Sequence, residues 1–255
     1  EANWVKSNPI VASYPEGIRS LRAALKVAME QPTKMRNFLT KGMGMWVDMV
    51  EDGYISLNKW NKQIISEKDA NDFIKGSNFY IGVDLSSTVD LTSVATVFVK
   101  EGKYLVTQTS FTPEDMYNER MSQNKTVRFD LYRDRGELIV TEGAIVDYEE
   151  VYQYILHLMD KYTSMGANFQ EVCFDKWQAT MMMTQLEANG VKVVEVPQAI
   201  THFSEPTKRF REELFIGNLF HLDDHLFQWS ITNAITVEDA SENIKLAKNK
   251  ANAKN

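Results

Sequence analysis

The chain has 255 residues, a formal net charge of −7, and 44% hydrophobic and 25% charged residues, which is ordinary for a globular protein. This acidity argues against a free-standing, tight DNA binder, because neutralising phosphates normally requires a basic surface. A single cysteine excludes an internal disulfide framework, and without a signal-peptide pattern or an apolar stretch of roughly 20 residues we expect a soluble, cytoplasmic protein.

The beginning of the chain is predicted to be a helical linker segment. Between residues 15 and 70 the apolar side chains recur at helical spacing, without the alternation of strands. The stretch "EKDANDFIKGSN" is then rich in polar and turn residues, which favours a boundary near residue 72. We therefore expect a helical linker over 1–72 and a second domain over 73–255.

Three antiparallel strands are predicted to open the second domain. Residues 79–85 are expected to form a strand that is apolar on both faces, followed by strands over 92–100 and 104–111 that a Glu101-Gly102 turn joins. The polar stretch 112–136 is expected to be a surface loop with little regular structure. Its length makes it a candidate functional loop.

Helices and parallel strands are predicted to alternate in the rest of the chain. A helix ending near residue 164, a strand ending at Asp175, a helix ended by Gly190 and a strand closed by Pro197 imply parallel pairing through a right-handed crossover. Ser204 is expected to be the N-cap of a further helix that runs to about residue 220, and the tail "KLAKNKANAKN" to be mobile. The summed order predicts an α/β fold, a mixed sheet with helices on both faces.

Two aspartates are the best candidates for chemistry. Asp84 and Asp175 each follow an apolar strand segment, and ligands of α/β sheets bind outside the carboxyl ends of strands. If those strands are neighbours, the two carboxylates meet, and a divalent cation that prefers oxygen ligands, Mg²⁺ or Mn²⁺, best compensates their charge. The alternative is that each aspartate only caps a turn or helix. Asp90 is a further candidate ligand, or merely ends the turn before the second strand.

Other polar groups give weaker signals. His202, His221 and His225 fit no common zinc spacing, so we expect ordinary polar or partly buried histidines. The basic patch "TKRFR" contains three candidate nucleic-acid-binding residues: Lys208, Arg209 and Arg211. A solvated helix face is the plainer interpretation of that patch. No phosphate-binding loop of the type G-x-x-x-x-G-K-S/T occurs, so this chain alone is not expected to be a P-loop ATPase.

Four stretches together resemble the carboxyl-terminal nuclease domain of the large terminase subunit of tailed bacteriophages. They are "YIGVDLSSTVDLTSVATVF", "GELIVTEGAIVDYEEV", "CFDKWQATMMMTQLEANGVKVVEVPQ" and "WSITNAITVEDASENIKLAKNK". The resemblance covers about 70–255, and the preceding residues look like the end of the packaging ATPase part, which is missing. It implies a ribonuclease H-like fold and an endonuclease that cuts concatemeric double-stranded viral DNA with two metal ions, Mg²⁺ or Mn²⁺.

The resemblance also assigns residues and partners. Asp84 in "GVDLS" matches the metal ligand of the first strand, Asp175 in "FDKW" matches the carboxylate at the end of the fourth strand, and Asp90 matches an acidic position near the metals. The family's third acidic ligand is expected just beyond Asn255, so we expect a truncated or prophage-derived fragment with an incomplete site. The implied partners in the full assembly are DNA, the small terminase subunit and the portal protein. The fragment itself is expected to be monomeric, in the bacterial host cytoplasm.

Two rival functions remain open on the sequence alone. "IGVDLSST" also resembles the first phosphate-binding turn of the actin and sugar-kinase superfamily, which predicts a second glycine-rich phosphate turn, whereas "CFDKW" stands at that place. The other rival is a docking domain without catalysis. Nucleotide binding would favour the first rival, and metal-dependent DNA cleavage would exclude the second.

Overall fold

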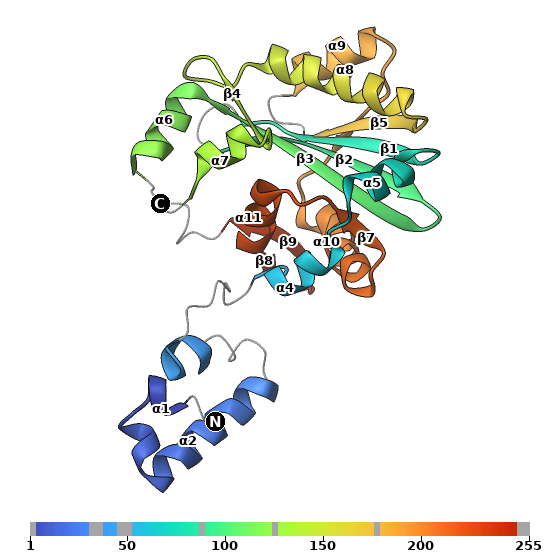
Figure 1. Cartoon of the computed structure of the whole chain (residues 1–255). Helices are drawn as coiled ribbons and strands as arrows, with labels where there is room; N and C mark the ends of the chain where they lie inside the picture. The colour runs from blue at the N-terminus through green and yellow to red at the C-terminus, as the bar shows by residue number, and fades with distance from the viewer. Residues whose placement is uncertain are drawn as a thin grey trace.

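A computed structural model of the chain describes residues 4–30, 38–44, 53–86, 90–123, 127–175 and 179–248 (Figure 1). The strands of the main sheet are β1 (Asn78–Asp84), β2 (Thr92–Lys100), β3 (Lys103–Pro113), β4 (Leu138–Thr141), β5 (Asn168–Asp175), β6 (Val193–Val196) and β7 (Leu219–His221). A separate hairpin is made of β8 (Ala234–Glu238) and β9 (Ile244–Lys248).

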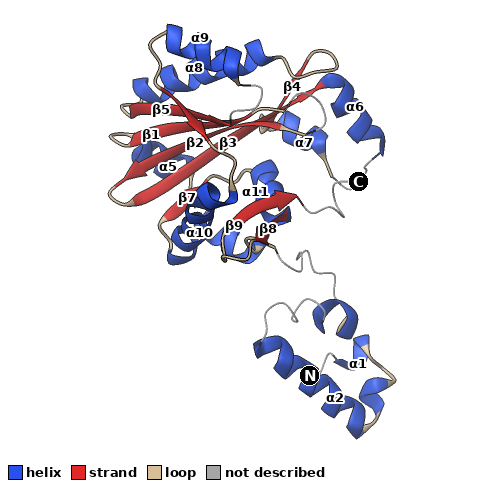
Figure 2. Cartoon of the chain, turned by 180° about the vertical axis from the view of Figure 1, so that it is seen from behind, coloured by secondary structure: helices blue, strands red, loops and turns tan. Residues whose placement is uncertain are grey.

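Figures 1 and 2 show helices on both faces of the sheet, with α1 (Trp4–Ser7) and α2 (Pro15–Glu30) lying apart from it. The other longer helices are α5 (Glu67–Ile74), α6 (Glu114–Gln123), α8 (Tyr148–Ser164), α9 (Thr180–Ala188), α10 (Ile200–Ile216) and α11 (His225–Asn233). Shorter pieces are α4 (Leu57–Trp60), α7 (Phe129–Asp134), the 3₁₀ turns Val11–Ser13 and Asn61–Gln63, and the π-turn Phe38–Gly42. Among the described residues, no helix is long and apolar enough to cross a membrane.

The strand order of the main sheet is β4-β3-β2-β1-β5-β6, with β7 also paired to β3. The first three strands form the predicted antiparallel meander, and the turn between β2 and β3 places Glu101 at φ 52° and Gly102 at φ 73°, the left-handed conformation that such tight turns need. β5 pairs parallel with both β1 and β6. The predicted parallel crossover is therefore confirmed, and the order is that of the expected ribonuclease H-like sheet.

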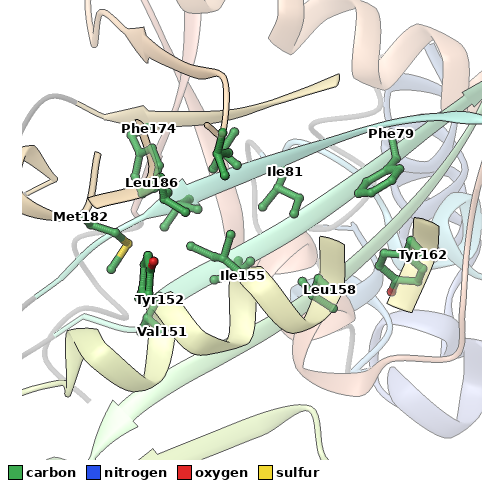
Figure 3. Packing of buried hydrophobic residues seen from close by; sticks show 14 of the residues in the cluster. Phe79, Ile81, Val151, Tyr152, Ile155, Leu158, Tyr162, Phe174, Met182 and Leu186 are labelled. Carbon is green, nitrogen blue, oxygen red and sulfur yellow. The ribbon is translucent and has the colours of Figure 1, made fainter. Parts of the chain in front are cut away.

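Each face of the sheet has its own apolar core. On one face, α8 places Val151, Ile155 and Leu158 against Ile81 of β1 and Phe174 of β5, all nearly fully buried (Figure 3). On the other face, a second cluster joins α4, α10, α11 and β7; it contains Tyr54, Ile55, Trp60, Val106, Leu214, Leu219, Phe227 and Ile231. The prediction of helices on both faces is confirmed.

Residues of the predicted linker are buried in two places, in an apolar cluster of their own and in the core of the sheet domain. Trp4, Leu21 and Phe38 are buried together in the helical part near the N-terminus. Tyr54 and Trp60, in contrast, are buried in the second cluster of the sheet domain. The boundary near residue 72 stays a prediction, with aromatic packing that crosses it.

The polar stretch 112–136 is not the irregular loop that the sequence suggested. It forms α6 and α7, because Tyr117 and Phe129 are buried in a cluster with Leu138 of β4 and Leu226 of α11. Strand β1 also differs from expectation: its side chains alternate between buried and half-exposed, so it is apolar on one face only. Asp84 is exposed, so burial does not make its charge costly.

Two further local predictions were wrong. Helix α10 begins at Ile200, and Ser204 is a buried residue within it whose Oγ accepts a hydrogen bond from the Ile244 backbone N–H at 3.1 Å. The start of the basic tail is strand β9, paired with β8, and the rest of that tail, from residue 249, lies outside the described residues. The Ser204 hydroxyl therefore binds the β8–β9 hairpin and does not cap a helix.

Candidate metal centre at the carboxyl end of the sheet

Asp84 and Asp175 occupy neighbouring positions at the ends of two adjacent parallel strands. The register of β1 with β5 pairs Val83 with Phe174, so the next residue on each strand is one of the two aspartates. Both strands remain paired up to that point, Asp84 opposite Ser93 of β2 and Asp175 opposite Val196 of β6. Because adjacent strands lie about 4.8 Å apart, the fold brings the two predicted carboxylates together.

The surroundings of Asp84 are polar and held by hydrogen bonds. The Thr92 Oγ1 accepts from the Ser86 N–H at 2.8 Å and donates to the Ser86 carbonyl oxygen at 2.9 Å, which ties the chain after Asp84 back to β2. Across the sheet, the hydroxyls of Ser93 and Ser110 lie 3.1 Å apart in the row that begins with Asp84. The strand end is therefore fixed by its neighbours.

Two carboxylates side by side favour a bound divalent cation. Like charges at this spacing repel each other, and Mg²⁺ and Mn²⁺ prefer oxygen ligands of this kind. Within the described part of the chain, no three acidic, histidine or cysteine side chains are grouped so that they could hold a metal ion. Two adjacent carboxylates have the chemistry that suits an oxygen-preferring cation, and the role of Asp84 and Asp175 as its ligands stays a prediction.

Asp90 lies outside the strand register that makes Asp84 and Asp175 neighbours. It precedes β2, three residues before the Ser93 that pairs with Asp84. Its negative charge acts on Arg120 of α6, where it raises the guanidinium pKa against the larger lowering effect of burial. The role of Asp90 as a metal ligand stays a prediction.

The basic patch of α10 lies at the other end of the sheet. Arg209 donates to the Tyr104 hydroxyl at 2.8 Å, and Tyr104 is aligned through Val99 of β2 with Asn78, the first residue of β1. Six residues along a strand separate that level from Asp84, about 20 Å. Lys208 donates to the Glu242 carbonyl oxygen at 2.9 Å, and the Arg211 guanidinium lies over the Tyr54 ring. The structure does not bring these three cations to the carboxylates, and their binding of nucleic acid stays a prediction.

The three histidines between residues 202 and 225 have separate surroundings. His221 is buried, stacks on Trp60 with the ring centroids 3.7 Å apart, and has its ring nitrogens 2.8 and 3.0 Å from the Leu222 and Trp60 carbonyl oxygens. Burial lowers its pKa. His225 Nδ1 lies 3.5 Å from the Glu137 carboxylate, whereas His202 is exposed. The expectation of ordinary polar or buried histidines agrees with these contacts.

A buried carboxylate pair lies beside His225. Burial raises the pKa of Asp224 to about 6, with the nearby charge of Glu137 acting in the same direction and the Phe227 N–H in the opposite one. Asp224 caps α11 through that Phe227 N–H at 2.7 Å, and Glu137 binds the Leu226 N–H and the Arg135 side chain. These groups fix the start of α11.

Arg120, near the carboxyl end of the sheet, is a charged residue that the sequence analysis did not identify as a candidate. The stretch that contains it was expected to be a loop. A helix start was readable there, because Pro113 precedes Glu114 and Asp115, the acidic first turn that helices favour. Tyr117 and Met121, four residues apart, supply the apolar side of that helix.

The comparisons with known proteins agree on one family. The family model described as "Terminase large subunit, endonuclease domain" matches residues 1–254. The large terminase subunit of Enterobacteria phage HK97 is 25% identical over 98% of this chain and 47% of its own length, and that of Lactococcus phage SK1 is 24% identical over 91% and 42%.

A solved structure supports the fold. The crystal structure of the HK97 bacteriophage large terminase matches with a TM-score of 0.66 at 21% identity, over 96% of this chain and 49% of that one. The chain thus spans about half the length of the curated relatives it matches. With a family model that covers nearly all of it, the chain belongs to the endonuclease-domain family of terminase large subunits.

Proposed function

We propose that this chain is a metal-dependent endonuclease that cuts concatemeric double-stranded viral DNA for packaging. The observation that carries the proposal is the register of β1 with β5, which makes Asp84 and Asp175 neighbours at two parallel strand ends. Membership of the terminase endonuclease-domain family supports the same activity. Neither observation favours the actin-like or sugar-kinase-like alternative.

Asp84 and Asp175 would hold the divalent ions through their carboxylate oxygens. A bound Mg²⁺ or Mn²⁺ would supply an activated water and stabilise the leaving oxygen in phosphodiester hydrolysis. The protein's contribution is positioning. Both carboxylates stand on strands paired on both sides, so their backbone positions are fixed before a substrate arrives.

The proposed substrate and partners follow from the family. Double-stranded DNA is the substrate, and the small terminase subunit and the portal protein are the proposed partners in the host cytoplasm. The acidic composition of this chain, with 35 acidic against 28 basic residues, supports the view that other parts of the assembly provide most of the DNA affinity.

Plasmid cleavage in Mn²⁺ tests the proposal, with this chain and with a version extended past Asn255. We expect cutting that chelation abolishes, and a loss of at least 100-fold for Asp84→Asn and for Asp175→Asn, because each substitution removes a ligand charge. Asp72→Asn, an exposed aspartate at the other end of the sheet, is the matched control.

If neither version cuts DNA, the nuclease proposal fails and the docking function replaces it. If cutting occurs but both active-site substitutions leave it unchanged, the metal ligands are wrongly assigned.

A further inference from the structure

Arg120 is held in place by two elements besides its own helix. Its guanidinium carbon lies 5.2 Å from the centre of the Phe129 ring of α7, and its Nη1 donates to the Thr112 Oγ1 of β3 at 3.3 Å. Phe129 and Thr112 are both buried. A guanidinium restrained on two sides loses little freedom when it binds a ligand, so the fold pre-organises this cation.

Arg120 is directed to the sheet face that carries Asp84. Asp84 pairs with Ser93, and Ser93 pairs with Ser110, so the three side chains lie on one face. Thr112 is two residues beyond Ser110 on β3 and therefore shares that face. The cation lies two strands away from Asp84, about 10 Å across the sheet, and further toward the carboxyl end.

Two carboxylates act on the charge of Arg120. Burial has the larger effect on the guanidinium pKa and lowers it, whereas Asp90 and, by a smaller amount, Glu119 raise it. A guanidinium remains protonated at any pH near neutrality, so the positive charge persists there. At this end of the sheet, Asp90 is therefore better explained as the anion that balances Arg120 than as an isolated acidic group.

We propose that Arg120 binds a backbone phosphate of the DNA strand engaged by Asp84 and Asp175, and that Asp90 holds its guanidinium until the phosphate displaces it. The inference rests on the proposed function, since it assumes a DNA substrate at the carboxylates. A guanidinium offers two parallel N–H donors that match a phosphate. Each DNA strand advances about 3.4 Å per nucleotide along the helix axis, so Arg120 lies within reach of a phosphate a few nucleotides from the one at the carboxylates.

The two possible roles of Asp90 predict different effects of Asp90→Asn on DNA affinity in the absence of metal ions. If Asp90 competes with phosphate for Arg120, Asp90→Asn strengthens binding by a larger factor when Arg120 is present. If Asp90 is only a metal ligand, removing its charge lessens repulsion of the phosphates by the same factor with or without Arg120, so Asp90→Asn is also measured in the Arg120→Gln background. Measuring in a chelator separates this interaction from any contribution of the metal site.

Fluorescence anisotropy of a labelled DNA duplex in EDTA, over a series of salt concentrations, tests the inference. Arg120→Gln removes the charge but keeps the apolar stem, and we expect about tenfold weaker binding and a salt slope smaller by about 0.9. Arg120→Lys should keep the slope and lose only part of the affinity. Asp90→Asn should bind several-fold more tightly. Arg19→Ala is the control, because Arg19 is an exposed arginine that likewise has a carboxylate partner, Glu16.

The inference is overturned if Arg120→Gln has the affinity and salt slope of Arg19→Ala, or if the unsubstituted chain does not bind the duplex at low salt. Thermal melts establish that each variant is folded. Should the Gln variant unfold, Asp90→Asn decides, because unchanged or weaker binding contradicts the competition. Loss of plasmid cleavage with an intact Arg120 effect on binding would instead reject the proposed nuclease function alone.

Discussion

The two ends of the sheet use polar and charged side chains in different ways. One end of the main sheet carries the β2–β3 turn and is called the hairpin end. There, His221 stacks on Trp60, Arg209 binds Tyr104, and Lys208 binds a carbonyl oxygen of the separate β8–β9 hairpin. At the carboxyl end, Asp84 and Asp175 are placed next to each other by the strand register. At the first end these polar side chains contact one another or the backbone, whereas the second end also places two carboxylates side by side.

This difference distinguishes polar residues that stabilise the fold from polar residues proposed to bind a metal ion. A buried histidine with both nitrogens near carbonyl oxygens contributes to the core. Neighbouring carboxylates at strand ends weaken the folded state unless a cation binds, and such sites are typical of function.

Removing the central aromatic of the hairpin end should have the largest effect on stability. Trp60 is fully buried between His221 and Phe227, so Trp60→Ala is expected to lower the free energy of unfolding by about 3–5 kcal/mol. Trp60→Phe should cost much less, since it keeps an aromatic ring and removes an indole N–H that has no hydrogen-bond partner. Urea titration measures both, and equal losses for the two variants would contradict the packing described.

Divalent metal should stabilise the carboxyl end by a smaller amount. At a Mn²⁺ concentration about 100 times its dissociation constant, we expect an increase in the free energy of unfolding of about 2.7 kcal/mol. Asp84→Asn should abolish this increase, whereas Asp72→Asn, near the hairpin end, should retain it. Thermal melts with and without Mn²⁺ provide the measurement. Equal stabilisation of all three proteins would place the metal elsewhere.

Asp224 provides a carboxylate whose ionisation the fold opposes. Its folded-state pKa of about 6 lies above the ordinary value of 3.8, so ionisation weakens the folded state above pH 6, and this loss disappears as the pH falls toward 4. Asp224→Asn keeps the N-cap of α11 and removes the charge. We expect about 2 kcal/mol of extra stability at pH 8 and none at pH 4.

Urea titrations of Asp224→Asn and the unsubstituted chain at both pH values make this comparison. The two proteins differ only at Asp224, so other titrating groups cancel. A constant difference between pH 4 and pH 8 would show that Asp224 does not titrate in this range.

The sequence predicted those features that depend on local pattern. Apolar, β-rich runs and turn residues predicted β1 to β3, and the strand-helix-strand order predicted the parallel pairing of β5 with β6. The pairing of β1 with β5, which makes Asp84 and Asp175 neighbours, was only a condition of the sequence argument, because no local pattern places those two strands side by side. Helix α6 has a local start signal at Pro113 to Asp115, but the burial of Tyr117 and Phe129 against Leu226 depends on residues distant in the chain, which a local pattern does not show.

The errors at Ser204 and Arg120 have related causes. Ser204 was taken for an N-cap, yet its hydroxyl binds the Ile244 N–H, a contact that only the docked hairpin creates. Arg120 acquires its position from Thr112 and Phe129, on a neighbouring strand and helix. The role of such a side chain depends on contacts with residues distant in the sequence, so its sequence neighbours alone do not predict it.

The central claim is that Asp84 and Asp175 together bind a catalytic divalent ion. A crystal of the chain soaked in MnCl₂ and measured at a wavelength where manganese scatters anomalously tests it most directly. We expect an anomalous peak within about 2.5 Å of oxygens from both carboxylates, absent in a crystal of Asp84→Asn. Manganese bound at other residues, with none between these two aspartates, would contradict the assignment.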